Sequence, residues 1–335
     1  MNTARDDQSQ TRRVAAIQMH AVVGDAAPNI AHAEQRIEEA FQAGAQIVAL
    51  PEFFTGAIAP RAQTAACVLP ARNAAIDMMS RLAARHGGWV GGSMLVEQDG
   101  EIYNRYVLVG PKGETHAHDK DLPTMWERAF YRGGSDDGVW QTELGGVGAA
   151  VCWELIRSQT VKRMRGRVEL AMTGTHWWTL PHNWPGAMRR MLASIGQYNR
   201  YLSEQAPVEF ARRLGAPVVQ ASHCGQIGGQ FRLGLGLQVP YETEYVGASQ
   251  IVDSRGQVLA SRNVMEGPGT VYADVALGAQ TPVCEDALER FWIPHLPLFL
   301  KAYWHQQNWV SEMVYRKTAR AAGVEAARRA AQGES

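Results

Sequence analysis

The sequence predicts an α/β protein in which two mixed β-sheets face each other and helices cover the outer face of each sheet. Two observations support this fold class. Short apolar runs bounded by glycine, proline or asparagine alternate with longer amphipathic segments, as strands alternate with helices. The order strand–helix–strand–helix–strand, followed by a hairpin, also occurs once in each half of the chain, so each half can form one sheet with its own helices.

In the first half, the apolar runs predict strands at residues 14–19, 46–50, 89–96 and 102–109, and a short strand that leads into residues 116–120. Two segments between these runs carry apolar side chains at helical spacing, with Ile37, Ala40 and Phe41 on one face of the first. They predict helices at residues 30–43 and 73–86. Each helix is followed by glycine, a common residue just after a helix end.

In the second half, the same signals predict strands at residues 147–151, 168–173, 216–222, 249–253, 257–260 and 269–275. Helices are predicted at residues 155–164 and 185–214. The glycine-rich stretch at residues 225–236 is predicted to be a loop. It matches neither a dinucleotide-binding fingerprint nor a phosphate-binding loop with a lysine.

The composition is that of a soluble globular protein, with 46% hydrophobic and 20% charged residues. The 33 basic side chains balance 33 acidic ones, so the overall charge favours neither nucleic acid nor an anionic membrane as a partner. No apolar run is long enough to cross a bilayer, and the first residues lack the apolar core of a secretory signal peptide. We therefore expect a cytoplasmic protein.

The four cysteines are scattered along the chain without a CxxC pair, which argues against a disulfide framework or a zinc finger. His176 and His182 are six positions apart and lack an obvious third ligand, so we interpret them as pocket or surface residues. We predict neither a metal nor an organic cofactor.

Two flanking segments differ from the predicted core. Residues 1–13 form a polar leader. Residues 281–335 form a C-terminal extension, in which aromatic residues and prolines at 291–304 precede a helical tail at 311–332 that is rich in alanine and arginine. Soluble monomers seldom expose large apolar patches, so we expect this extension to pack on another subunit of a homodimer or higher homo-oligomer. Packing on the body of the same chain is the alternative.

Cys152 follows one of the predicted buried strands and precedes a predicted helix. The stretch Gly145-Gly-Val-Gly-Ala-Ala-Val-Cys-Trp-Glu154 places its thiol at a strand-to-helix turn. Backbone N–H groups at such a turn stabilise a thiolate and a developing oxyanion, which favours a nucleophilic role. A buried structural cysteine is the alternative, because free cysteines are among the most buried residues.

Glu52 ends the second apolar strand, in the run Ala49-Leu-Pro-Glu-Phe-Phe54. Its apolar neighbours reduce its contact with water, and desolvation raises the pKa of a carboxyl group. A carboxyl group that titrates near neutral pH suits a general base that accepts and returns a proton. The alternative is a strand-end carboxylate paired with a nearby arginine.

Lys120 lies in His118-Asp-Lys-Asp-Leu-Pro-Thr-Met-Trp-Glu127. A fixed ammonium group beside a reacting thiol stabilises both the thiolate and a tetrahedral anion. The two flanking aspartates offer a simpler interpretation, which is an ion pair in solvent. For Glu127 the corresponding alternative is a pair with Arg128 on a helix surface.

Aromatic and polar residues alternate after the strand at residues 168–173, in Gly174-Thr-His-Trp-Trp178. Such residues at a strand end often line a ligand pocket, although they can equally form a packing cluster or an interface. We predict that His176 and Trp177 bind the substrate, together with Phe53 and Trp153, which adjoin Glu52 and Cys152 in the sequence.

The order Glu52, Lys120, Cys152, each at or just after a strand end, resembles the nitrilase, or carbon–nitrogen hydrolase, superfamily. The three runs quoted above look like its glutamate, lysine and nucleophile motifs, and the similarity covers roughly residues 14–275. Cys152-Trp-Glu154 is most similar to the nitrilase branch. Two departures are Asp119, where family members often have arginine, and the absence after Glu52 of the aromatic-Pro-Gly-Tyr pattern that is common in nitrilases.

The resemblance implies a four-layer α-β-β-α sandwich for residues 14–280. It implies that Cys152 is the nucleophile, Glu52 the general base and acid, and Lys120 the group that stabilises the tetrahedral intermediate. Glu127 matches a second family glutamate that positions substrate and base, and the N–H of Trp153 would complete the oxyanion site. The implied reaction converts a small nitrile to a carboxylic acid and ammonia through a cysteine thioimidate and thioester.

Three alternatives stay open. The same site suits an amidase or an N-carbamoyl-amine hydrolase, whose substrate would be a small amide or carbamoyl compound. A thiol-dependent acyltransferase on the same fold would pass the acyl group to an amine or a lipid instead of water. A catalytically silent scaffold with Cys152 buried in its core belongs to another class of protein altogether.

Overall fold

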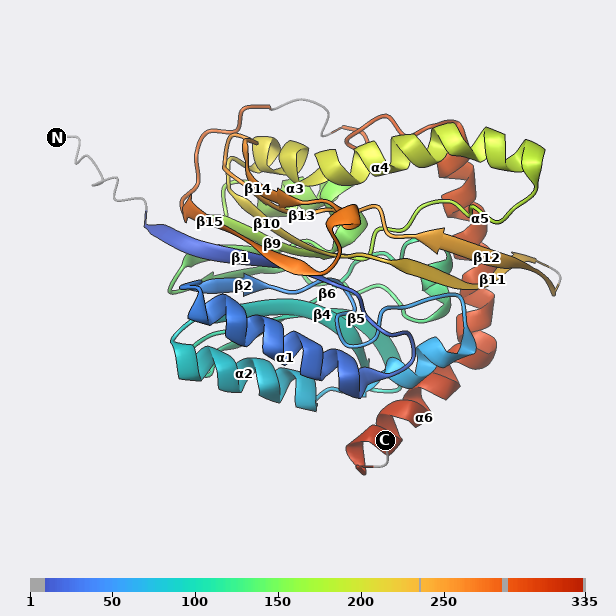
Figure 1. Ribbon diagram of the computed structural model, residues 1–335, viewed down its shortest axis with the longest axis horizontal. Helices are drawn as coiled ribbons and strands as arrows, with labels where there is room; N and C mark the ends of the chain where they lie inside the picture. Colours follow the sequence, from blue (N-terminus) through green and yellow to red (C-terminus); the bar gives the residue numbers. More distant parts are fainter. Residues whose placement is uncertain (1–9, 235, 285–288, 334–335) are drawn as a thin grey trace.

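The computed structural model describes residues 10–234, 236–284 and 289–333 of the 335-residue chain. Over these residues, two mixed β-sheets pack face to face and helices cover both outer faces (Figure 1). This α-β-β-α layering confirms the fold class that the sequence predicts.

The first sheet is formed mainly by the N-terminal half of the chain. Its strand order is β6-β5-β4-β2-β1-β15, in which β1, β2 and β4 are parallel and the other pairings are antiparallel. The bounds are β1 (Thr11–Met19), β2 (Ile47–Ala49), β4 (Trp89–Gln98), β5 (Glu101–Val109), β6 (Thr115–Asp119) and β15 (Gly269–Ala276), with the short β3 (Leu69–Pro70) beside β4.

The second sheet has the order β7-β8-β9-β10-β13-β14, with β8, β9 and β10 parallel. The two sheets are joined where the ends of β1 and β10 pair, at Gln18 with Ser222 and Met19 with His223. The bounds are β7 (Val139–Thr142), β8 (Gly145–Ala149), β9 (Leu170–Thr175), β10 (Val218–His223), β13 (Ser249–Val252) and β14 (Val258–Arg262).

The helices α1 (Ala26–Gln42) and α2 (Ala74–His86) cover the first sheet, and α3 (Ser158–Met164) and α4 (Gly186–Leu214) cover the second (Figure 1). Helix α1 buries the predicted apolar face of Ile37, Ala40 and Phe41. Helix α2 begins after Asn73, whose side chain accepts two backbone hydrogen bonds, and ends at Gly87 in the left-handed conformation. These ends agree with the predicted ones to within one residue.

The loop predicted for the glycine-rich stretch is wrong. These residues form an antiparallel hairpin of β11 (Gln226–Gly234) and β12 (Leu237–Glu244). The glycines allow another segment to approach the strand closely. A Cβ atom on Gly229 would lie 2.5 Å from the carbonyl oxygen of Pro60, so a larger residue would not fit there. The predicted helix at 155–164 begins later, as α3 at Ser158, and a separate 3₁₀ turn, η3 (Cys152–Ile156), precedes it with the extended Arg157 between them.

The C-terminal extension is helical from Leu298 to Ala331. Helix α5 (Leu298–Val314), a π-helical turn η5 (Tyr315–Ala319) and helix α6 (Arg320–Ala331) run across one end of both sheets (Figure 1). The Trp292 and Trp304 rings pack within the chain, 5.6 Å apart between centroids, whereas Leu298 and Trp309 are 81% and 65% exposed. Contact with another subunit stays a prediction. Within the described residues, no helix combines the length and the apolar content needed to cross a membrane.

Candidate active site

Four strands end at the same place between the two sheets and bring the predicted residues together. Glu52 follows β2, Lys120 follows β6, and His176 follows β9. Cys152 comes three positions after β8. Because β2 and β4 are parallel and β6 has the direction of β4, these side chains collect at carboxyl ends of strands, where α/β proteins commonly build their sites.

Glu52 is fully buried and accepts three hydrogen bonds. Its Oε1 accepts from the Nδ2 of Asn104 at 2.7 Å and from the Nζ of Lys120 at 2.8 Å. Its Oε2 accepts from the backbone N–H of His176 at 2.9 Å. Burial raises the pKa of Glu52 to about 7, although Lys120 opposes the shift. The arginine pairing considered from the sequence is wrong, because the cation beside Glu52 is Lys120.

Lys120 is not the solvated ion pair that its flanking aspartates suggest. Its ammonium group is buried and donates to Glu52 and, at 3.2 Å, to the Oε2 of Glu127. Asp119 pairs instead with Arg105 at 2.8 Å. Burial alone would lower the pKa of Lys120, but the carboxylates of Glu127 and Glu52 raise it well above its ordinary value. The site therefore contains a permanent positive charge.

Glu127 lies on the 3₁₀ turn η2 (Met125–Ala129) and is buried rather than at a helix surface. Besides Lys120, its Oε2 accepts from the hydroxyl of Tyr131 at 2.8 Å, and its Oε1 accepts from the indole N–H of Trp178 at 3.2 Å. Arg128 pairs with Glu312 at 2.9 Å. Three donors thus hold the Glu127 carboxylate in place.

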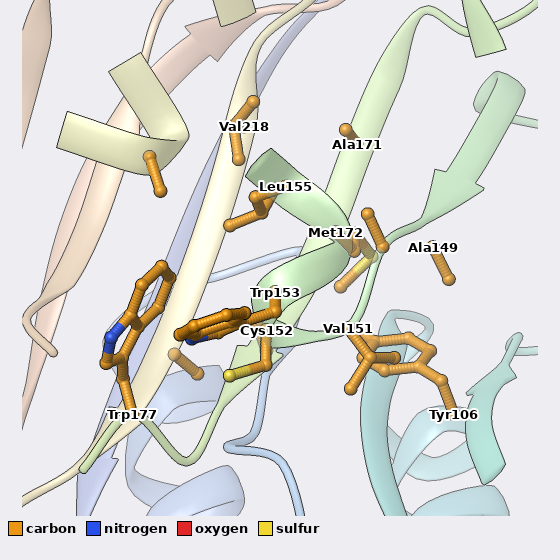
Figure 2. Close-up of a cluster of buried hydrophobic side chains, with 14 of the residues drawn as sticks. Tyr106, Ala149, Val151, Cys152, Trp153, Leu155, Ala171, Met172, Trp177 and Val218 are labelled. Carbon is orange, nitrogen blue, oxygen red and sulfur yellow. The ribbon is translucent and has the colours of Figure 1, made fainter. Parts of the chain in front are cut away.

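The Cys152 thiol is buried in an apolar cluster, where the Trp153 and Trp177 rings lie beside it with their centroids 5.8 Å apart (Figure 2). Burial first, and then the charge of Glu52, raise the pKa of Cys152 well above its ordinary value, and Lys120 only partly offsets this. The backbone N–H groups of the turn therefore do not offset burial, and the thiol needs a base, which is the role expected of Glu52.

Backbone strain is concentrated around these residues. Five non-glycine residues in the described part of the chain have positive φ, and three of them adjoin the site: Phe53 at 54°, Met125 at 55° and Cys152 at 54°. Left-handed backbone is uncommon for such side chains and costs roughly 1–3 kcal/mol at each position. Strain of this kind persists where the surrounding structure holds it, and it is frequent at functional sites.

Gly174 in β9 allows the two sheets to approach each other at the site. A Cβ atom there would lie 2.4 Å from the backbone nitrogen of Glu52. The missing side chain lets β9 pass directly beside the strand end that carries Glu52, and the N–H of His176 then reaches the carboxylate.

A small cavity of about 10 Å³ adjoins Cys152, with room for about one water molecule. The predicted pocket residues Trp153, His176 and Trp177 line it, together with Trp178. Phe53 does not line it. Its ring packs behind the site against His176 and Tyr131, with centroid distances of 5.4 and 5.8 Å.

His176 is a neutral pocket residue. Its Nε2 is 2.8 Å from the hydroxyl of Tyr245, and burial lowers the pKa of the imidazole well below its ordinary value. It therefore brings no positive charge to the pocket. In the described residues, no group of three or more His, Cys, Asp or Glu side chains is placed to hold a metal ion.

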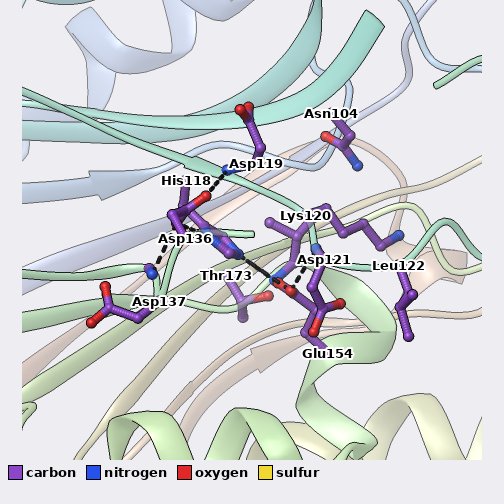
Figure 3. Close-up of polar contacts among 12 residues, drawn as sticks. Asn104, His118, Asp119, Lys120, Asp121, Leu122, Asp136, Asp137, Glu154 and Thr173 are labelled. Atoms are coloured by element: carbon purple, nitrogen blue, oxygen red, sulfur yellow. Dashed lines mark hydrogen bonds and ion pairs between the residues drawn. The ribbon is translucent and has the colours of Figure 1, made fainter. Parts of the chain in front are cut away.

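A second buried charge cluster, the Glu154 network, connects the lysine and cysteine segments (Figure 3). The Glu154 carboxylate accepts from the backbone N–H of Val151 at 2.7 Å, from that of Asp121 at 3.0 Å and from Arg163 at 2.8 Å. It also pairs with the Nε2 of His118 at 3.0 Å. The turn before Cys152 and the backbone after Lys120 are therefore bonded to one carboxylate.

We predict that His118→Asn weakens the fold most strongly at neutral and acidic pH. Burial alone would lower the pKa of His118, but Glu154 and Asp136 raise it to about 10. A folded-state pKa above the unfolded value of about 6.5 gives a stabilisation that is complete below pH 6.5 and is lost as the pH rises towards 10. The expected loss at pH 6 is roughly 3–5 kcal/mol, as for one partner removed from a buried ion pair.

Urea unfolding of the wild type and of His118→Asn at pH 6, 8 and 10 measures this effect. The difference in the free energy of unfolding should shrink as the pH rises. His116→Asn is the matched control, because His116 lies in the same strand and stacks on Trp140 outside the Glu154 network. A His118→Asn difference that stays constant from pH 6 to 10 would contradict the prediction.

Sequence reasoning missed Asn104, Tyr131 and the His118–Glu154 pair. Asn104 gave the clearest available signal, since it is a polar residue at an inward-facing position of the predicted strand at residues 102–109. Tyr131 and His118 gave none, because each depends on which distant carboxylate the fold brings beside it.

Known proteins are similar to this chain in sequence and in fold. The model of the carbon–nitrogen hydrolase family matches residues 13–283. A bifunctional nitrilase/nitrile hydratase of Lupinus angustifolius is 31% identical over 176 residues, which are 46% of this chain and 50% of that protein. An omega-amidase of Xenopus tropicalis is 30% identical over 139 residues, or 38% of this chain and 50% of that protein. The chain therefore spans about half the length of these curated relatives.

Solved structures share the fold. A carbon–nitrogen hydrolase from Helicobacter pylori G27 aligns with a TM-score of 0.61 at 16% identity, covering 79% of this chain and 89% of that one. An amidase from Nesterenkonia sp. AN1 aligns with a TM-score of 0.56 at 20% identity, covering 83% and 95%. At these identities the likeness concerns the fold. Because the family model spans most of the chain, this protein belongs to the carbon–nitrogen hydrolase family.

Proposed function

We propose that the protein hydrolyses non-peptide carbon–nitrogen bonds of small molecules, with Cys152 as nucleophile, Glu52 as general base and acid, and Lys120 as electrostatic stabiliser. One observation carries the proposal. A thiol, a carboxyl group with a pKa of about 7 and a permanently charged ammonium group are buried together where their strands end. These are the parts that activation of a thiol nucleophile requires.

The reaction starts from a neutral thiol. Ionised Glu52 takes the proton while the sulfur attacks the electrophilic carbon, because the raised pKa of Cys152 disfavours a free thiolate. Lys120 and the N–H of Trp153 stabilise the negative charge that develops on the attacked group. Glu52 returns its proton as ammonia leaves and then activates a water molecule that hydrolyses the thioester. Glu127 keeps Lys120 and the substrate in position.

A nitrile is the substrate we propose first. The cavity is walled mainly by indole rings and other apolar side chains, and the hydroxyls of Thr124 and Tyr303, unpartnered within the described residues, also line it. The Glu127 carboxylate lines the cavity and could accept from an amide, but it already accepts hydrogen bonds from Lys120, Tyr131 and Trp178. A nitrile has no N–H group to satisfy. Its thioimidate takes up water and loses ammonia, and so reaches the thioester that an amide forms directly.

An amide is the second candidate, and the similarity to an omega-amidase favours it. We predict that kcat/KM for a nitrile exceeds kcat/KM for the matching amide, with ammonia release as the measurement and Cys152→Ala as the background control. Several acyl groups are needed, so that the comparison does not depend on one side chain. If the amide is the better substrate throughout, the amidase assignment replaces the nitrilase one.

We also propose that the protein self-associates. Large apolar side chains of α5 remain open to solvent, and patches of this kind often mark contacts between subunits. The exposed ones are Leu298, Phe299, Trp309 and Met313.

A further inference from the structure

Part of the wall around the substrate cavity comes from outside the family domain. Leu300 and Tyr303, both on α5, line the same cavity as Cys152 and Glu127. The match to the family ends at residue 283, and α5 begins at Leu298. The similarity that identifies the family therefore does not extend to this wall.

Helix α5 is attached to the body of the protein on two sides. It packs along η2, which carries Glu127, and Arg128 of η2 pairs with Glu312 at 2.9 Å. On the other side, the Nε2 of Gln307 donates to the backbone carbonyl of Arg232 in β11 at 3.1 Å. These bonds fix the helix so that Leu300, which is buried, faces the cavity.

Tyr303 brings an unsatisfied polar group to the cavity. Its ring stacks on Phe231 at a centroid distance of 5.8 Å and on Phe299 at 6.0 Å, which fixes its orientation. Its hydroxyl is buried and has no hydrogen-bond partner among the described residues, and the same is true of the hydroxyl of Thr124, which also lines the cavity. Buried polar groups normally have partners, so two free hydroxyls on one cavity wall point to a ligand that supplies them.

We propose that Leu300 and Tyr303 are specificity-determining residues: Leu300 limits the size of the acyl group, and the Tyr303 hydroxyl, with that of Thr124, binds a hydroxyl or carbonyl oxygen on it. The inference rests on the proposed hydrolase function and names its substrate class. This class is small aliphatic nitriles, or their amides, that carry one oxygen function. The cavity of about 10 Å³ holds about one water molecule, so even a substrate of this class enters only when the wall formed by α5 moves.

The size limit is tested with Leu300→Ala on a series of unbranched aliphatic nitriles of increasing length. One methylene in an apolar pocket changes kcat/KM by roughly 10–200-fold. We therefore expect the ratio of kcat/KM for the longer over the shorter substrate to rise roughly 10-fold or more. Leu259→Ala is the matched control, because Leu259 is an exposed leucine on β14 and lies outside both the cavity and α5. An unchanged ratio in Leu300→Ala overturns the size limit.

The polar contact is tested with Tyr303→Phe on a hydroxylated nitrile and its unsubstituted parent. A site built to bind a substrate hydroxyl loses discrimination when its partner is removed, so kcat/KM for the hydroxylated substrate should fall roughly 10-fold relative to the parent. Tyr201→Phe is the control, since Tyr201 is 59% exposed on α4. An equal effect on both substrates overturns the contact.

Alkylation of Cys152 separates this inference from the hydrolase proposal, because it needs no turnover. Labelling by iodoacetamide and by a bulkier N-aryl iodoacetamide is followed by mass spectrometry of the Cys152 peptide. In Leu300→Ala the bulky-to-small rate ratio should rise at least about 10-fold. If the labelling ratio rises in Leu300→Ala but the wild type releases no ammonia from any substrate, the role of Leu300 in the cavity wall is supported and the hydrolase proposal is refuted. If the wild type releases ammonia normally and the labelling ratio is unchanged in Leu300→Ala, only the role of Leu300 in the cavity wall is refuted.

Discussion

Replacement of Cys152 by alanine is expected to abolish turnover and to leave the fold intact. The sulfur forms the covalent bond of each proposed intermediate, so neither Glu52 nor Lys120 has a reaction to assist once it is removed. Loss of a nucleophile that acts as a unit with its base lowers kcat by roughly a millionfold in a well-characterised hydrolase, and we expect a loss of several powers of ten here. Ammonia release from the best nitrile measures the effect.

The fold should survive because the change removes a single buried sulfur atom and leaves the Glu52–Lys120–Glu127 pairing in place. Thermal unfolding followed by circular dichroism checks this. Cys67→Ala is the matched control, since Cys67 is another buried free thiol and lies outside the cavity. Substantial ammonia release by purified Cys152→Ala, with contaminating wild-type enzyme excluded, would remove Cys152 as the nucleophile.

The layered fold could be predicted because the local sequence indicates where its strands and helices lie. Strands such as residues 14–19 and 216–222 are mostly apolar, as expected for strands buried on both faces, and α2 has a capping asparagine at one end and glycine at the other. The hairpin at β11–β12 could not be predicted in this way. Its glycines are explained by the approach of Pro60, which is a contact between distant parts of the chain.

The position of the candidate site could be predicted for a related reason. Glu52, Lys120 and Cys152 each follow a strand, and the carboxyl ends of parallel strands meet at one edge of a sheet. Their partners could not be predicted from local sequence. Lys120 has an aspartate on each side and yet bonds to Glu52 and Glu127, because burial selects the carboxylates that the fold brings within reach.

The thiol illustrates a limit of a different kind. A strand-to-helix turn offers N–H groups to Cys152, and sequence reasoning counts these as stabilising a thiolate. The structure adds burial and the Glu52 charge, and both act in the opposite direction on the pKa of Cys152. Which influence is larger depends on solvent exposure, and solvent exposure is a property of the assembled sheets.

Glu52→Gln is expected to remove most of the activity and to change how the remainder depends on pH. Glutamine keeps the length of the side chain but cannot accept a proton, so both thiol activation and thioester hydrolysis slow down. General-base catalysis contributes roughly 10²–10⁴-fold, and kcat should fall by an amount in that range or beyond. Intact-mass measurement with a good substrate should show either a stalled covalent adduct or unreacted protein.

The pH dependence gives the sharper test of this role. Burial raises the pKa of Glu52 from 4.5 to about 7, and only the ionised form can take the thiol proton. In the wild type, kcat/KM should therefore rise about tenfold per pH unit below 7 and level off above it, since kcat/KM follows the ionisation of the free enzyme. Glu52→Gln should lose this rise of kcat/KM below pH 7, the acid limb of the profile. Glu38→Gln, on the outer helix α1, should keep it. Normal steady-state turnover by Glu52→Gln, or an unaltered acid limb in that variant, would show that another group is the base.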